Sequence, residues 1–171
     1  SKEEVQKANI IIGRPPVDMV KNSTNLKWLQ LNTAGVDLYI EEGVLNKDVI
    51  LTNSTGAYGK AVSEHMLAML LELLKKLHIY RDNQNKRLWQ SEGSVKSISN
   101  CKVLIVGLGD IGSNFGKMVK ALGGYTIGVK RRLSDKPSFI DELYLNDKLD
   151  ELLLHISLFC LVNSPIRIKE I

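Results

Sequence analysis

The sequence has few cysteines and no long apolar run, and both absences limit the classes of protein it can represent. Cys101 and Cys160 are the only cysteines among 171 residues, and no histidines accompany them at the spacing of metal ligands. Isolated thiols in apolar segments argue against a disulfide framework, and we expect no metal site. The longest apolar stretches contain a handful of residues, whereas a membrane-spanning helix needs roughly 20.

A strong charge bias is also lacking. The net charge is only +4, from 23 Lys and Arg against 19 Asp and Glu, and aromatic residues make up 6% of the chain. A nucleic-acid surface would combine a clustered basic stripe with interleaved aromatic residues. Residues 1–4 include two acids where a secretory signal would carry basic and then apolar residues. We therefore expect a cytoplasmic protein that binds neither nucleic acid nor membranes.

What the sequence does contain is an alternation of β-rich and helical segments, which is typical of an α/β fold with a parallel sheet. In the first part we expect strands at 8–13, 26–31 and 49–53, with a short helix at 17–22. The longest predicted helix covers residues 60–80. Its apolar residues occupy more than one stripe, which predicts burial on several sides, between two domains or against another subunit.

The polar segment 82–99 is predicted to be a linker, so we expect one domain at 1–95 and a second at 96–171. After the linker, we expect strands at 102–106, 125–129 and 158–162 and helices at 110–122 and 145–154. This β-α-β-α-β order is that of the first mononucleotide-binding half of a Rossmann domain, and a complete dinucleotide fold contains two such halves.

One glycine motif lies at the first strand–helix junction of that half. Residues 107–112 read Gly-Leu-Gly-Asp-Ile-Gly, which matches G-x-G-x-x-G directly after an apolar strand and at the start of an amphipathic helix. Gly107 would allow the tight turn, Gly109 would let the backbone approach a diphosphate, and Gly112 would let the helix pack closely on the strand. With Asp110 and Ile111, these glycines are our candidate cofactor-binding residues, because amides at a helix start attract phosphate.

The end of the next strand bears on which dinucleotide is bound. An acid about 20 residues beyond the motif pairs with the adenosine ribose of NAD, whereas a basic residue accommodates the 2′-phosphate of NADP. Here Lys130, Arg131 and Arg132 stand in succession, and no acid occurs until Asp135. We therefore expect a preference for NADP, with NAD possible if the three cations form only an exposed basic loop.

Several separate segments resemble one known family. Residues 29–37, 53–65, 103–112, 143–153 and 163–165 are similar, in order, to signature segments of the D-isomer-specific 2-hydroxyacid dehydrogenases, of the glycerate, phosphoglycerate and glyoxylate/hydroxypyruvate reductase type. The resemblance implies a flavodoxin-like substrate domain whose first strand precedes this chain, followed by the first half of a Rossmann domain. It also implies an oxidoreductase that reduces small 2-oxo acids with NAD(P)H.

The resemblance further implies roles for particular positions. The amides of Ala34, Gly35 and Val36 would face the substrate carboxylate, and Val162 would join the cofactor-binding set. Glu64 and His65 match a Val-x-Glu-His pattern with a structural role, and the 60–80 helix would form a homodimer. The catalytic arginine, carboxylate and histidine would lie beyond Ile171, so we expect a chain truncated at both ends and inactive by itself.

Two other interpretations stay open at this point. The family resemblance also covers transcriptional corepressors, which use the same fold as a dinucleotide-binding dimerisation module without enzymatic activity. A truncated relic that binds nothing is the third possibility. It would expose an unpaired sheet edge and tend to associate through it.

Overall fold

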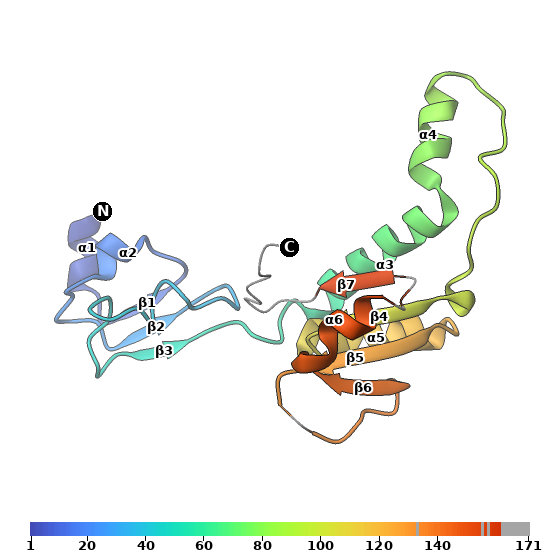
Figure 1. The fold of residues 1–171 in the computed structure, drawn as a ribbon. Coiled ribbons are helices and arrows are strands. Elements are labelled where there is room, and N and C mark those ends of the chain that lie inside the picture. The colour runs from blue at the N-terminus through green and yellow to red at the C-terminus, as the bar shows by residue number, and fades with distance from the viewer. Residues whose placement is uncertain (133, 155, 157, 162–171) are drawn as a thin grey trace. The chain divides into compact units, whose positions relative to one another are not determined.

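The computed structural model describes residues 1–132, 134–154, 156 and 158–161, and it forms two compact units (Figure 1). The first unit ends at Tyr58 and the second begins at Gly59. This division differs from the expected boundary at residue 95, because the helix that follows Gly59 packs within the second unit. Its Leu70 and Leu74 share a buried cluster with Phe115.

The first unit is a three-stranded parallel sheet with two short helices. Its elements are α1 (Lys2–Lys7), β1 (Ile10–Ile12), α2 (Val17–Val20), β2 (Trp28–Gln30) and β3 (Ile50–Thr52), and the strand order is β1-β2-β3. All three predicted strands are present but shorter than expected. Helix α1 was not predicted; Ser1 and Glu4 cap its start reciprocally, and this capping box is a known helix signal. The core consists of Val20, Leu26, Leu29, Leu31, Tyr39 and Val44.

The predicted helix at 60–80 is two helices in the structure. Helix α3 covers Gly59–Lys75 and α4 covers Leu77–Asn85, and Lys76 between them has a left-handed backbone with φ of 57°. Helix α4 also includes residues 82–85, which we had assigned to the linker. These polar residues stay helical because Asn83 is buried and its Nδ2 donates to Glu92 Oε1 at 2.6 Å.

The second unit contains a four-stranded parallel sheet. Its strands are β4 (Lys102–Val106), β5 (Tyr125–Lys130), β6 (Glu142–Leu145) and β7 (Leu158–Leu161). The other elements of this part are α5 (Asp110–Ala121), α6 (Leu149–Leu153) and the 3₁₀ turns Ile98–Asn100 and Asn146–Lys148. The order is β6-β5-β4-β7. Strand β6 was not predicted, because its four residues mix one charge with half-buried side chains and give no clear period. The strand predicted to be third is therefore the fourth, on the other side of β4.

Both faces of this sheet are covered, and Figure 1 shows α5 and α6 on opposite faces. On one face, Val103 and Ile105 of β4 pack with Phe115 and Val119 of α5. On the other face, the alternate β4 residues join residues of β5, β6 and α6 in a second cluster, which contains Leu104, Val106, Ile127, Val129, Tyr144, Leu149 and Leu152. A strand buried on both faces reads as a continuous apolar run, which is why β4 was predicted at its observed bounds.

An ion pair ties the end of α5 to the β5–β6 connection. Lys120 Nζ lies 2.5 Å from Asp141 Oδ1, and the Thr126 amide and hydroxyl donate to Asp141 Oδ2 at 2.8 and 3.0 Å. Burial alone would raise the pKa of Asp141, but hydrogen bonds from Lys120 and Thr126 outweigh it and lower that pKa. The connection that leads from β5 to β6 is thus anchored to the helix. Among the described residues, no helix has the length and apolar content needed to cross a membrane.

Candidate functional site

The glycine loop at residues 107–112 joins β4 to α5 as the sequence predicts. Gly107 has φ of 94°, in the left-handed region that favours glycine, and its amide donates to the Val129 carbonyl at 3.0 Å. Ser113 closes the first turn of α5 by donating its amide to the Gly109 carbonyl at 3.0 Å. The loop therefore turns sharply at the end of β4 and presents the start of α5.

Gly112 and Gly109 lack side chains for different reasons. A β-carbon at Gly112 would overlap the Gly107 carbonyl oxygen and lie 3.4 Å from Ile105 Cγ2, so the packing of α5 on β4 requires glycine there. A β-carbon at Gly109 would meet no atom of the described residues within 4 Å. Gly109 is the exposed N-cap of α5 and contributes no capping side chain, which leaves space in front of the helix amides.

The loop lies where the strand order of the sheet reverses. Strands β5 and β6 lie on one side of β4, β7 lies on the other, and Val106 at the end of β4 is in register with Leu161 of β7. In open parallel sheets, ligands bind outside the carboxyl ends of the strands at such a switch point. The geometry therefore places the open helix start in the usual position for a dinucleotide diphosphate.

The remaining predicted residues of this loop have distinct surroundings. Ile111 is half-buried and packs against the core, so its side chain serves the fold. Asp110 is exposed, and its carboxylate accepts a hydrogen bond from Asn114 Nδ2 at 3.1 Å. Leu108 lies over Gly128 of β5, where an added β-carbon would be 2.6 Å from Leu108 Cδ1. Gly128 was not among our candidates, although a glycine inside a strand is a signal of close approach.

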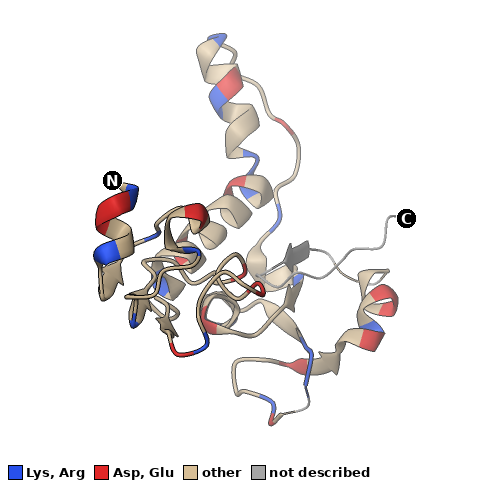
Figure 2. Cartoon of the chain, turned by 90° about the vertical axis from the view of Figure 1, so that its left-hand side faces the viewer, with Lys and Arg blue, Asp and Glu red and all other residues tan. Residues whose placement is uncertain are grey.

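The three successive cations begin at Lys130, the last residue of β5, next to the glycine loop. Val129 is in register with Val106 at the end of β4, and Lys130 with Leu145. Lys130 Nζ donates to Ser134 Oγ at 2.8 Å, and Arg131 and Arg132 are exposed. Elsewhere on each unit, basic and acidic residues are interspersed along the ribbon (Figure 2). The run is therefore distinguished by its position beside the loop rather than by a broad basic face.

The first unit carries a loop that has the features of a small anion site. Asn53 Nδ2 donates to the Ala34 carbonyl at 2.7 Å, and Thr33 Oγ1 donates to the Gly35 carbonyl at 3.2 Å. These bonds hold the carbonyls, whereas the amides of Ala34, Gly35 and Val36 donate to no acceptor among the described residues. The loop borders a hollow of about 150 Å³ that is also lined by Arg14, Tyr39 and one acid, Asp37, so an anion there would meet a guanidinium and a carboxylate. Successive free amides beside a guanidinium suit a carboxylate.

Comparison with known proteins identifies the family. Residues 67–165 match the family described as D-isomer specific 2-hydroxyacid dehydrogenase, NAD binding domain. The chain belongs to this family. The match covers more than half of the chain and includes the glycine loop, the three cations and the switch point, so the resemblance inferred from sequence is confirmed.

Solved and curated relatives agree with this assignment. A D-isomer specific 2-hydroxyacid dehydrogenase family protein from Aeromonas salmonicida has a TM-score of 0.86 and 28% identity, over 97% of this chain and 53% of its own. A D-lactate dehydrogenase from Aquifex aeolicus, solved with NAD and lactic acid, shares the fold, with a TM-score of 0.81 and 20% identity over 95% of this chain and 50% of its own. A glyoxylate/hydroxypyruvate reductase of Arabidopsis thaliana is 25% identical over 89% of this chain and 50% of its own length.

This chain spans about half the length, or less, of the curated relatives that it matches, from 39% to 50% among three of them. Some predictions also lie outside the described residues: Val162, the 163–165 segment, and the catalytic groups expected beyond Ile171. Glu64 and His65 are exposed on α3, and no group of three metal-ligating side chains occurs in the part of the chain that the structure describes.

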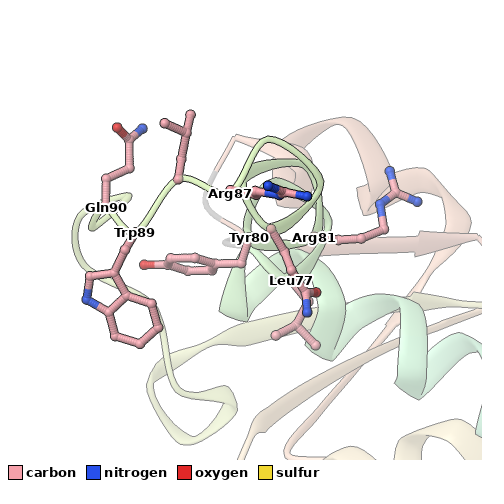
Figure 3. A pocket seen from close by; sticks show the side chains of 8 residues that line it. Leu77, Tyr80, Arg81, Arg87, Trp89 and Gln90 are labelled. Atoms are coloured by element: carbon pink, nitrogen blue, oxygen red, sulfur yellow. The ribbon is translucent and has the colours of Figure 1, made fainter.

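An apolar hollow lies along α4 and the chain that follows it (Figure 3). Its volume is about 650 Å³, and its lining comes from one short stretch of chain: Leu77, Tyr80, Arg81, Gln84, Arg87, Leu88, Trp89 and Gln90. Trp89 is fully exposed, and Leu77 and Leu88 are about half exposed. The loop is held to α4 by Glu92, whose Oε1 accepts from Asn83 and whose amide donates to Tyr80 Oη at 3.1 Å. Hydrogen bonds from Gln90 and Asn83 lower the pKa of Glu92, so it is charged at neutral pH.

Proposed function

We propose that this chain supplies the dinucleotide-binding and substrate-carboxylate-binding parts of an NAD(P)-dependent D-2-hydroxyacid dehydrogenase. The observation that carries the proposal is the open space at Gly109, in front of the uncapped amides of α5 and at the switch point of the sheet. A diphosphate fits both features, because the amides donate to its oxygens and the helix dipole favours its charge. The family assignment points to the same cofactor class.

The proposed reaction is the reversible reduction of a 2-oxo acid. The bound dinucleotide would supply the hydride for the carbonyl carbon, and a proton on the carbonyl oxygen would complete the 2-hydroxy acid. In this proposal the amides of Ala34, Gly35 and Val36 hold the substrate carboxylate. Proton transfer is assigned to a histidine and carboxylate of the second mononucleotide half, so the 171 residues alone should bind the cofactor without turnover.

Binding and turnover can be measured separately on the same preparation. Isothermal titration with NAD and NADP should show one site per chain. NADPH and NADH absorbance should stay constant when glyoxylate, hydroxypyruvate or pyruvate is added. A chain that binds neither dinucleotide would overturn the proposed function. Steady oxidation of NADPH by any of these acids would show turnover by the 171 residues alone, and it would overturn the assignment of proton transfer to residues outside them.

We also propose that the cofactor is NADP, on account of the three cations after β5. Substitution of Arg131 and Arg132 by glutamine is expected to weaken NADP binding about ten-fold or more, since charge-assisted contacts to the 2′-phosphate would be lost. NAD lacks that phosphate, so its affinity should change less than two-fold. Isothermal titration of both dinucleotides against both proteins measures the difference.

A matched control removes the same charge elsewhere. Lys47 and Lys96 are exposed, one on each unit, and their double glutamine variant should leave the ratio of NADP to NAD affinity unchanged. If wild-type chain binds NAD at least as tightly as NADP, the three cations form only a basic surface loop and the preference is wrong.

We further propose that the chain forms a homodimer, and that the α4 hollow is part of the interface. The same short segment carries an apolar depression and an uncovered tryptophan, so two copies related by a two-fold axis could each bury the other's indole. Tyr80 and the two arginines of the lining suit an aromatic partner through stacking and cation–π contacts.

Trp89→Ala is the corresponding test. Because buried tryptophans carry much of the binding energy of an interface, this change is expected to raise the dimer dissociation constant at least about ten-fold. Sedimentation equilibrium measures that constant directly. Leu122→Ala removes an exposed apolar side chain from α5's end and should leave it unchanged. A wild-type chain that sediments as a monomer at all concentrations would contradict the dimer.

A further inference from the structure

The Asp110 carboxylate of the glycine loop lies directly against Gly59, the first residue of α3. A β-carbon built at Gly59 would overlap both carboxylate oxygens and Cγ of Asp110. Gly59 is itself buried, and its backbone does not require a left-handed conformation. Glycine costs stability in a helix, so a buried one needs another reason for its presence, and the space taken by Asp110 supplies it.

The position of Asp110 makes that contact important for the cofactor. Asp110 is the first residue of α5, directly after Gly109, so its charge sits beside the amides that would receive a diphosphate. A carboxylate pointing across those amides would repel the diphosphate and compete for the same helix dipole. In the structure the carboxylate instead accepts a hydrogen bond from Asn114 Nδ2 and lies against Gly59 at the amino end of α3.

The amino end of α3 is a favourable place for this carboxylate. Helix α3 has 17 residues, and its first turn contains no acid of its own. A negative charge near a helix N-terminus is stabilised by the aligned peptide dipoles. Asp110, the first residue of α5, therefore places a negative charge at the start of α3. It can do so only because residue 59 has no side chain.

We propose that Gly59 is a positioning residue for dinucleotide binding: by lacking a side chain, it lets the Asp110 carboxylate lie against α3 and keeps its charge off the diphosphate position. The inference rests on the proposed dinucleotide site and extends it to a residue far from the glycine motif in sequence. A methyl group at residue 59 would displace the end of one flexible, exposed side chain, and the backbone of α3 can stay in place.

The test is a double-mutant cycle in the full 171-residue chain, with NAD and NADP titrated calorimetrically. Gly59→Ala is expected to weaken both dinucleotides about five-fold, the effect of moving the Asp110 charge to within a few ångströms of the diphosphate. Asp110→Asn removes the charge and sets the reference affinity of the cycle. Gly59→Ala combined with Asp110→Asn should bind like Asp110→Asn alone, because the displaced group then carries no charge. Raising the salt from about 0.05 M to about 0.5 M should shrink the gap between wild type and Gly59→Ala.

Asp110→Glu provides a second route to the same result without changing α3. We expect that a side chain longer by one methylene group does not keep its carboxylate against Gly59, so Asp110→Glu should also weaken dinucleotide binding several-fold. Circular dichroism should confirm that each variant is folded. Equal affinity of wild type and Gly59→Ala, or a loss that Asp110→Asn does not restore, overturns the inference and leaves the proposed function intact. A wild-type chain that binds no dinucleotide overturns both.

Discussion

Replacing Gly109 with valine is expected to lower the affinity for dinucleotide at least about 100-fold while lowering the free energy of unfolding by only about 1 kcal/mol, the cost of an apolar residue at the N-cap of α5. No atom of the described residues lies within 4 Å of the new β-carbon, and the backbone of Gly109 (φ −79°, ψ −155°) has a negative φ, so it is not in the left-handed region that favours glycine. The fold therefore tolerates the side chain, and the diphosphate does not.

Calorimetric titration and urea unfolding of the same protein measure the two quantities. Gly35→Val is a matched control in the first unit, where the nearest atom to an added β-carbon is Asp37 Oδ2 at 3.9 Å; it should leave dinucleotide affinity unchanged. Retention of wild-type affinity by the Gly109 variant would show that no ligand approaches this face of the loop.

Gly112→Ala should have the opposite pattern, with a large loss of stability. The new methyl group would overlap the Gly107 carbonyl oxygen, a backbone atom, so α5 must shift away from β4. Overpacking of this kind costs about 1–3 kcal/mol or more, against a gain of about 1 kcal/mol from replacing a helical glycine. We expect a net loss of about 2 kcal/mol in the free energy of unfolding, together with weaker dinucleotide binding.

Urea unfolding of Gly116→Ala, one turn further along α5, calibrates this result. There the added β-carbon would be 3.2 Å from Ile105 Cδ1 and from the Phe139 ring, and these side chains can move slightly. The propensity gain should then nearly balance the packing cost. If the Gly112 variant is no less stable than the Gly116 variant, the close contact between α5 and the loop is wrong.

The best-predicted part of the fold is the β4–loop–α5 unit, where several local signals coincide. A continuous apolar run, a glycine motif and an amphipathic period follow one another, and the strand was placed at its observed bounds. Strand β6 was missed because its pairing with β5 is a tertiary property, and its four residues lack a clear period. The break at Lys76 was missed for a similar reason: the contacts that hold α4 join Asn83 and Tyr80 to Glu92, on a loop that follows the helix.

In the candidate site too, the sequence predicted the features set by nearby residues and missed those set by distant ones. Gly107 and Gly112 could be assigned from sequence because the turn at Gly107 is local and the atoms that exclude a side chain at Gly112 lie within seven residues of it. Gly59 and Gly128 could not, since the atoms that exclude a side chain there belong to Asp110 and Leu108, which are distant in the chain. The preference for NADP stays a prediction from the charge of residues 130–132, because Arg131 and Arg132 are exposed.

The difference between the two loop glycines has an evolutionary consequence. A descendant of this chain that no longer used a dinucleotide could accept almost any residue at position 109, since no neighbour would resist the change. Position 112 would stay glycine in the same lineage, because every fold-retaining descendant faces the same carbonyl. Gly109 therefore records selection for the ligand, and Gly112 records selection for the packing of α5 on the loop.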